Sequence, residues 1–99
     1  MRLTLVYTLK AQIDLVGLWE DYLARGTAAA DAALQVVVEQ ASELLTFPEM
    51  GRSREDLGPG LRSLRKNNRL LVYKLEGEHI VIVRVIYAQS DLSSTDFET

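Results

Sequence analysis

The sequence has 99 residues, 47% of them apolar, and a formal net charge of −3. A chain of this length and composition folds as a single domain around one modest core, which excludes an intrinsically disordered protein. It has no cysteine, no apolar segment of the roughly 20 residues that a transmembrane helix needs, and no signal-peptide pattern, so we expect a cytoplasmic protein without disulfides or thiolate metal sites.

The first quarter of the chain predicts a strand followed by a helix. Residues 3–7 alternate apolar and polar side chains that favour β-structure. Thr8 is placed to cap a helix, and apolar residues recur at helical spacing over residues 11–24. Gly26 marks the end of this helix. The acids on this helix are expected to face water: Asp14, Glu20 and Asp21.

A second helix is predicted between Thr27, as its N-cap, and Pro48, which ends it. Its apolar stripe has the period of an α-helix and comprises Ala30, Leu34, Val37, Val38, Ala41, Leu44 and Leu45. Because only a tight turn separates the two helices, we expect them to form an antiparallel helical hairpin.

The second half of the chain predicts strands. A turn-rich loop at 49–60 precedes strands at 61–66, 69–75 and 79–87, with turns at 67–68 and 76–78. The last strand is apolar on both faces, which indicates an interior position in the sheet. The polar tail, about residues 90–99, is expected to be loose or to form one helical turn. The fold class is therefore α+β with two layers: an N-terminal strand, a helical hairpin and a three-stranded antiparallel segment that completes one sheet.

Positive charge is concentrated in one stretch. Between residues 52 and 69 there are two acids and six basic residues: Arg52, Arg54, Arg62, Arg65, Lys66 and Arg69. This stretch carries +4, so the rest of the chain carries −7. The arginines suit phosphate or carboxylate groups and predict a binding surface, because their planar side chains donate in pairs. The alternative is a solvated basic edge that prevents the sheet from aggregating.

Three groups of residues resemble the ParE/RelE superfamily of bacterial toxins, over about residues 2–88. The first is the loop pattern Pro48, Gly51-Arg52, Asp56-Leu57 and Gly60-Leu61-Arg62. The second is the pair of closing strands with Leu71-Val72-Tyr73-Lys74 and Ile82-Val83-Arg84-Val85-Ile86-Tyr87. The third is the first helix with Ala11, Asp14-Leu15 and Trp19 to Tyr22. Each group alone is weak evidence for the family, but the order and spacing of the three groups together are specific.

The resemblance implies the same strand–helix–helix–strands fold and one of two activities. ParE-like members poison DNA gyrase, and RelE-like members cleave messenger RNA on the ribosome. Both are neutralised in a hetero-oligomer by a cognate antitoxin, here ParD-like or RelB-like. We expect neither a metal nor another cofactor, because the sequence has no phosphate-binding glycine loop, serine triad or metal-ligand cluster.

The same resemblance implies candidate site residues. A ribonuclease would use Arg52, Arg62, Arg84 and Tyr87. Arg84 either pairs with an acid at the strand end or forms the base of a site, because an unpaired buried charge is unfavourable. Tyr87 is either a packed strand-end tyrosine or, as the resemblance to ribonuclease members implies, a general acid/base or a residue that stacks on an RNA base. A phenol with its ordinary pKa is a poor base at neutral pH.

Target or antitoxin binding is expected to involve Arg52, Arg54, Arg62, Arg65 and Arg69. Trp19 and Tyr22 are candidates for the core, or for an apolar groove that receives an antitoxin helix. Only three lysines are present, and none lies in the loop at 49–60. Ribonuclease activity needs several cations around the cleaved phosphate, so the sequence favours a gyrase-binding toxin. The alternatives are a RelE-like endoribonuclease and a degenerate toxin that only binds its antitoxin.

Overall fold

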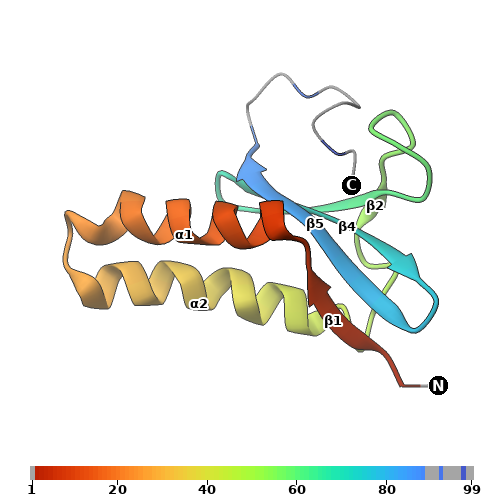
Figure 1. The fold of residues 1–99 in the computed structure, drawn as a ribbon, viewed down its shortest axis with the longest axis horizontal. Coiled ribbons are helices and arrows are strands. Elements are labelled where there is room, and N and C mark those ends of the chain that lie inside the picture. Colours follow the sequence, from red (N-terminus) through yellow and green to blue (C-terminus); the bar gives the residue numbers. More distant parts are fainter. Residues whose placement is uncertain (1, 89–91, 93–96, 98–99) are drawn as a thin grey trace.

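The computed structural model describes residues 2–88, Leu92 and Phe97. In this part of the chain the elements are β1 (Thr4–Tyr7), α1 (Leu9–Leu23), α2 (Thr27–Glu43), β2 (Arg52–Ser53), β3 (Arg62–Lys66), β4 (Arg69–Glu76) and β5 (His79–Tyr87). The two helices form one layer and the sheet the other (Figure 1), which confirms the predicted α+β fold. No helix in this part of the chain is long and apolar enough to cross a membrane.

The sheet has five strands in the order β1-β5-β4-β3-β2. β1 pairs with β5 in parallel, and the other pairings are antiparallel. The predicted interior position of the strand at 79–87 is confirmed, because β5 lies between β1 and β4. β2 was not predicted: it has only two residues, too few to show the alternation by which a strand is recognised.

The helix ends show one correct prediction and one wrong one. The Thr8 hydroxyl caps α1 by accepting a hydrogen bond from the Ala11 amide at 3.0 Å. Thr27, predicted as the N-cap of α2, is instead its first residue, and Gly26 occupies the cap position without a side-chain hydrogen bond. The tight turn between the helices needs the φ of 104° found at Gly26, which glycine adopts without a steric penalty.

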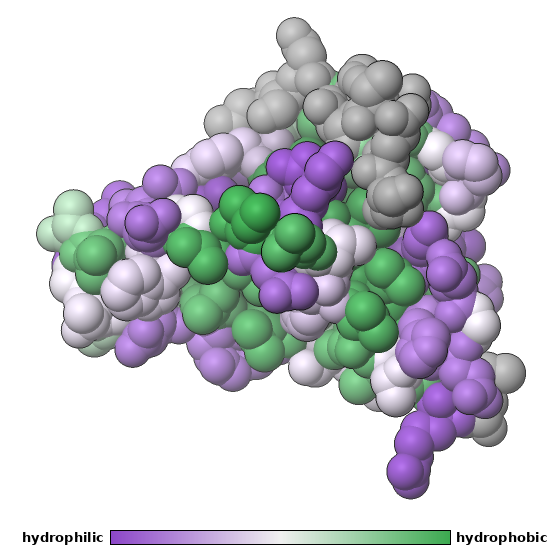
Figure 2. Space-filling model, viewed as in Figure 1, coloured by the Kyte–Doolittle hydropathy of each residue, from purple (hydrophilic) through white to green (hydrophobic). Residues whose placement is uncertain are grey.

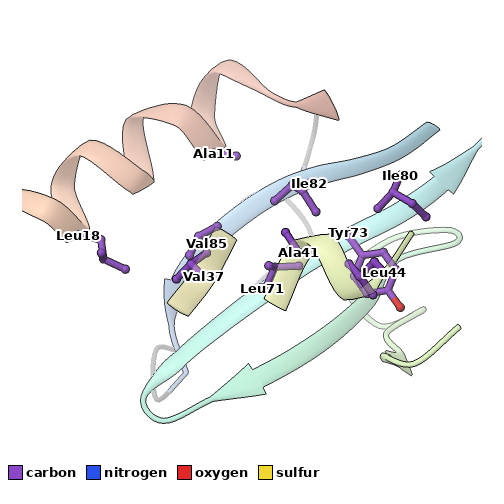
Figure 3. Close-up of a cluster of buried hydrophobic side chains, with 10 residues drawn as sticks. All are labelled: Ala11, Leu18, Val37, Ala41, Leu44, Leu71, Tyr73, Ile80, Ile82 and Val85. Atoms are coloured by element: carbon purple, nitrogen blue, oxygen red, sulfur yellow. The ribbon is translucent and has the colours of Figure 1, made fainter. Parts of the chain in front are cut away.

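The main core lies between the helices and one face of the sheet (Figure 3). The helices contribute Ala11, Leu18, Val37, Ala41 and Leu44. The strands contribute Leu71, Tyr73, Ile80, Ile82 and Val85. The alanines are fully buried, so the helices approach the sheet closely. Truncating a buried leucine or isoleucine here would cost about 2–5 kcal/mol of folding stability.

A smaller cluster covers the opposite face of the sheet. It consists of Leu57, Leu61, Leu70, Val72, Val83 and Phe97. Phe97 is only 5% exposed, so the tail is not loose at that position, and the alternative expectation of one helical turn is left standing. Of the other tail residues, Leu92 packs beside this cluster, and positions 90, 91, 93–96, 98 and 99 lie outside the described residues.

Candidate functional site

Helix α1 covers the edge of β5 that β1 leaves open. The β1–β5 pairing ends at Ile82. Beyond it, the Thr8 hydroxyl donates to the Val83 carbonyl at 2.8 Å, and the Val85 amide donates to the Asp14 carboxylate at 2.9 Å. The side chains of the α1 cap and of Asp14 therefore form hydrogen bonds with backbone groups at the open edge of β5. These bonds hold the helix against the end of β5 that carries the candidate residues.

Arg84 is paired with Asp14. Its Nε donates to Oδ2 at 2.7 Å and its Nη2 to Oδ1 at 3.0 Å. The side chains are 22% and 13% exposed, so the ion pair is largely removed from water. Of the two alternatives for Arg84, the structure places it in the paired arrangement. The prediction that Asp14 faces water is wrong, because its carboxylate turns towards β5 to neutralise this arginine.

Tyr87 lies in a cluster with Arg69 and Asp21. Its hydroxyl donates to the Asp21 carboxylate at 2.7 Å, and Arg69 Nη2 approaches the tyrosine oxygen at 3.2 Å and the carboxylate at 3.4 Å. The Arg69 guanidinium carbon lies 3.9 Å from the centroid of the Tyr87 ring, within the range of a cation–π contact. The hydrogen bond to Asp21 raises the pKa of Tyr87 and lowers that of Asp21.

Arg62 and Tyr73 hold the loop that precedes β2. The two residues are register partners in β3 and β4. The Tyr73 hydroxyl accepts from the Gly51 amide at 2.9 Å and donates to the Pro48 carbonyl at 2.8 Å. Arg62 Nη1 donates to the Gly51 carbonyl at 2.7 Å, and its Nη2 lies 3.8 Å from the Glu49 carboxylate. These contacts fix the loop that presents Arg52.

The basic stretch does not form one cluster, because its members have different partners. Arg54 pairs with Asp56 through two hydrogen bonds of 3.0 Å, which lower the pKa of that carboxylate. Arg65 is exposed and donates to the Asn67 carbonyl, and Arg52 is exposed on β2. Arg69 is buried beside Tyr87. Within residues 2–88, 92 and 97, no three His, Asp or Glu side chains are arranged to hold a metal ion.

Trp19 and Tyr22, which the sequence groups together, have different surroundings in the structure. Trp19 Nε1 donates to the Asp31 carboxylate at 2.9 Å and so ties α1 to α2. Tyr22 lines a depression of about 330 Å³, and the Arg25 guanidinium lies 5.2 Å from its ring centroid. Trp19 is not among the residues that line this depression.

Helix α1 also exposes apolar side chains. Leu9, Ile13 and Val16 are 71%, 61% and 58% exposed, and their spacing places them on one face of the helix. Figure 2 shows apolar surface over the helical layer, between hydrophilic side chains. Exposed apolar surface of this kind is typical of a region that a partner covers.

Sequence reasoning missed the roles of Asp14 and Asp21. The two acids are seven residues apart on α1, a spacing that returns to the same face of a helix after about two turns. The end of β5 faces them, with Arg84 and Tyr87 as their partners. That spacing was the available signal, but the packing of α1 against β5 was needed to interpret it.

Comparisons with known proteins agree on the family. The family model for the ParE toxin of the type II toxin–antitoxin system parDE matches residues 5–92. Toxin ParE3 of Caulobacter vibrioides is 35% identical over 69 residues, which cover 70% of this chain and 69% of that protein.

Two solved structures are similar over nearly the whole length of the matched chains. The chromosomal ParDE toxin–antitoxin system from P. aeruginosa has a TM-score of 0.78 at 27% identity, and the match covers 89% of this chain and 98% of that one. The toxin–antitoxin complex RelBE2 from Mycobacterium tuberculosis has a TM-score of 0.68 at 25% identity, covering 88% and 99%. The family match, the relative and the fold together lead to one conclusion: the chain belongs to the ParE toxin family of type II toxin–antitoxin systems.

Proposed function

We propose that this chain is a toxin that binds DNA gyrase and stalls it, and that an antitoxin encoded beside it neutralises it. Membership of the ParE family supports the toxin role. The similar structures are those of a ParDE system and a RelBE2 complex, which supports an antitoxin partner for this chain as well. On this proposal the chain acts as a binding protein rather than as an enzyme.

The observation that carries the proposal is the state of Tyr87. A tyrosine can act as a general base only when its phenol is already deprotonated, and at neutral pH this requires a lowered pKa. The hydrogen bond from Tyr87 to Asp21 does the opposite and raises the pKa of the phenol. Tyr87 therefore keeps its proton at neutral pH and is poorly suited to activate the nucleophile in RNA cleavage.

The arginines of the ribonuclease alternative are also engaged within the fold. Phosphodiester cleavage needs cations that can reach the charge developing on the phosphate. Arg84 donates two hydrogen bonds to Asp14, and Arg62 donates to the backbone of the loop at 49–51. Moving Arg84 to a phosphate would take the counter-charge from the largely covered Asp14 carboxylate, and moving Arg62 would take a donor from the Gly51 carbonyl.

The surface available to a target comprises the exposed basic residues and the apolar face of α1. Arg52 and Arg65 are exposed at the β2–β3 side of the sheet. Leu9, Ile13 and Val16 are exposed on α1. Arg54 is largely covered and bound to Asp56, so we assign it to holding its loop. Among the basic residues, we propose Arg52 and Arg65 as target contacts.

The test compares two activities of the purified protein. We expect it to inhibit negative supercoiling of DNA by gyrase and to leave translated messenger RNA intact in a ribosome-containing extract. Cleavage of the messenger without inhibition of gyrase would identify a RelE-like endoribonuclease. Neither activity, together with binding to the antitoxin, would identify a degenerate toxin.

A further inference from the structure

The exposed apolar side chains of α1 form a stripe with a regular spacing. Leu23 is 40% exposed and extends the row that Leu9, Ile13 and Val16 begin. Glu20 is exposed in the same row, so the five residues follow one another at intervals of four, three, four and three. This alternation is the spacing at which one helix packs side by side along another. Helix α1 therefore presents an unused packing face on the side that faces away from the core.

The middle of this stripe allows another helix to come close. Gly17 follows Val16, the midpoint of α1, and a Cβ at Gly17 would meet nothing within 4 Å. Gly17 also lines a depression of about 380 Å³ between α1 and β5, which Ile86 and Tyr87 line from the strand. A projecting valine thus stands beside a gap. Close helix packing needs such a pair, because a side chain of one helix enters a gap in the other.

The stripe is symmetric about its midpoint, which indicates a second copy of this chain as its partner. Leu9 and Leu23 are each seven residues from Val16. When two copies of α1 pair in antiparallel orientation, Leu9 of each copy faces Leu23 of the other, and Val16 of each copy lies near Gly17 of the other. A two-fold interface uses the same patch on both subunits, so that patch must be complementary to itself, as this stripe is.

The charges of α1 favour the antiparallel orientation. Lys10 lies near the beginning of the helix, and the acids Glu20 and Asp21 lie near its end. Antiparallel pairing brings the basic end of one copy beside the acidic end of the other and keeps the two Glu20 residues about 12 Å apart along the helix axis. Parallel pairing would place the two Glu20 side chains against each other within the apolar stripe, where like charges repel.

We propose that two copies of the free toxin associate through α1 as an antiparallel, two-fold symmetric dimer, with an interface formed by Leu9, Ile13, Val16, Gly17 and Leu23. Helix α1 packs on β5 and β1, whereas β2 lies at the opposite edge of the sheet (Figure 1). The dimer therefore leaves Arg52 and Arg65 exposed in both copies. The inference does not depend on the proposed target.

The first arm of the test measures self-association of the full-length chain. Sedimentation velocity is recorded from about 1 to 200 µM, a range that suits an interface of one helix pair. Ile13→Glu places a charge in the stripe, and Leu75→Glu makes the same kind of change on β4, where Leu75 is 51% exposed. We expect the wild type and Leu75→Glu to dimerise equally, and Ile13→Glu to raise the dissociation constant at least about tenfold.

The second arm determines the orientation of the two helices. The chain has no cysteine, so each single-cysteine variant carries one thiol. Val16→Cys lies at the proposed axis and is expected to form a disulfide between two copies under mild oxidation. Leu9→Cys lies about 21 Å along the helix axis from its counterpart and is not, but it should form a disulfide with Leu23→Cys when the two variants are mixed. Leu75→Cys measures the background from random collisions.

The outcomes separate the interface from its orientation. A wild type that stays monomeric over the whole concentration range would overturn the inference. Dimerisation of Ile13→Glu equal to that of the wild type, with the fold verified by circular dichroism, would overturn the α1 face as the interface. Disulfide formation by Leu9→Cys alone, together with only background formation by Val16→Cys, would overturn the antiparallel arrangement. Neither arm uses gyrase, so failure of the proposed target leaves both results interpretable.

Discussion

Arg84 and Asp14 are 70 residues apart in the chain, yet they form an ion pair with two hydrogen bonds of 2.7 and 3.0 Å. The pair lies where β5 passes α1, and the same carboxylate also accepts from the Val85 amide. One acid therefore joins the helical layer to the sheet, through the Arg84 guanidinium and the Val85 amide.

Replacing Asp14 with Asn tests that role. The substitution removes the carboxylate charge from a largely covered, doubly hydrogen-bonded ion pair, so we expect a loss of about 2–3 kcal/mol in the free energy of unfolding. Urea denaturation followed by circular dichroism measures the change. Glu20→Gln removes an exposed acid from the same helix and should change stability by less than about 0.5 kcal/mol. Equal midpoints for the two variants would show that the ion pair does not hold α1 on β5.

Two glycines make a matched test of packing. A Cβ at Gly51 would lie 2.6 Å from Tyr73 Cε1 and 2.9 Å from the Ser63 carbonyl oxygen, so Gly51→Ala should destabilise the fold by about 1–3 kcal/mol. A Cβ at Gly17, inside α1, would meet nothing within 4 Å. Gly17→Ala should therefore stabilise the protein by about 0.5–1 kcal/mol, the difference in helix propensity. Thermal melts measure both, and the opposite order of stability would refute the packing of the Gly51 loop.

The protonation of Tyr87 can be measured directly. Because its folded-state pKa is raised, its hydrogen bond stabilises the fold fully below the ordinary phenol pKa of about 10 and is lost as the pH rises through the folded-state value. The difference between the tyrosinate absorbance titrations of the wild type and Tyr87→Phe should show this phenol ionising above its ordinary pKa. Asp21→Asn should bring it back towards that pKa. Ionisation near neutral pH would favour the ribonuclease instead.

Growth arrest by Tyr87→Phe separates binding from catalysis. The variant keeps the ring that contacts Arg69 and removes only the hydroxyl. Loss of a general acid or base lowers a reaction rate by about 10²–10⁴-fold. We expect growth arrest on induction to be as strong as for the wild type. Full loss of toxicity in a variant with wild-type thermal stability would assign chemistry to the hydroxyl.

Much of the fold follows from local patterns. The strand at 79–87 is predicted with its observed bounds because its apolar run is long and bordered by a turn, and Thr8 is identified as a cap because capping depends on near neighbours. The burial of Phe97 and the partners of Arg84 and Tyr87 could not be predicted, because they depend on contacts between distant segments. In the candidate site, the sequence identified residue types but not which of them are already paired.

The most direct test of the central claim is the formation of cleaved DNA by gyrase in the presence of the purified toxin. Relaxed circular plasmid is incubated with gyrase, ATP and the toxin, then treated with detergent and protease before electrophoresis. The proposed function predicts linear DNA that increases with toxin concentration, requires gyrase and disappears when the antitoxin is added first. Unbroken plasmid at every toxin concentration, together with cleavage of messenger RNA in a translating extract, would contradict it.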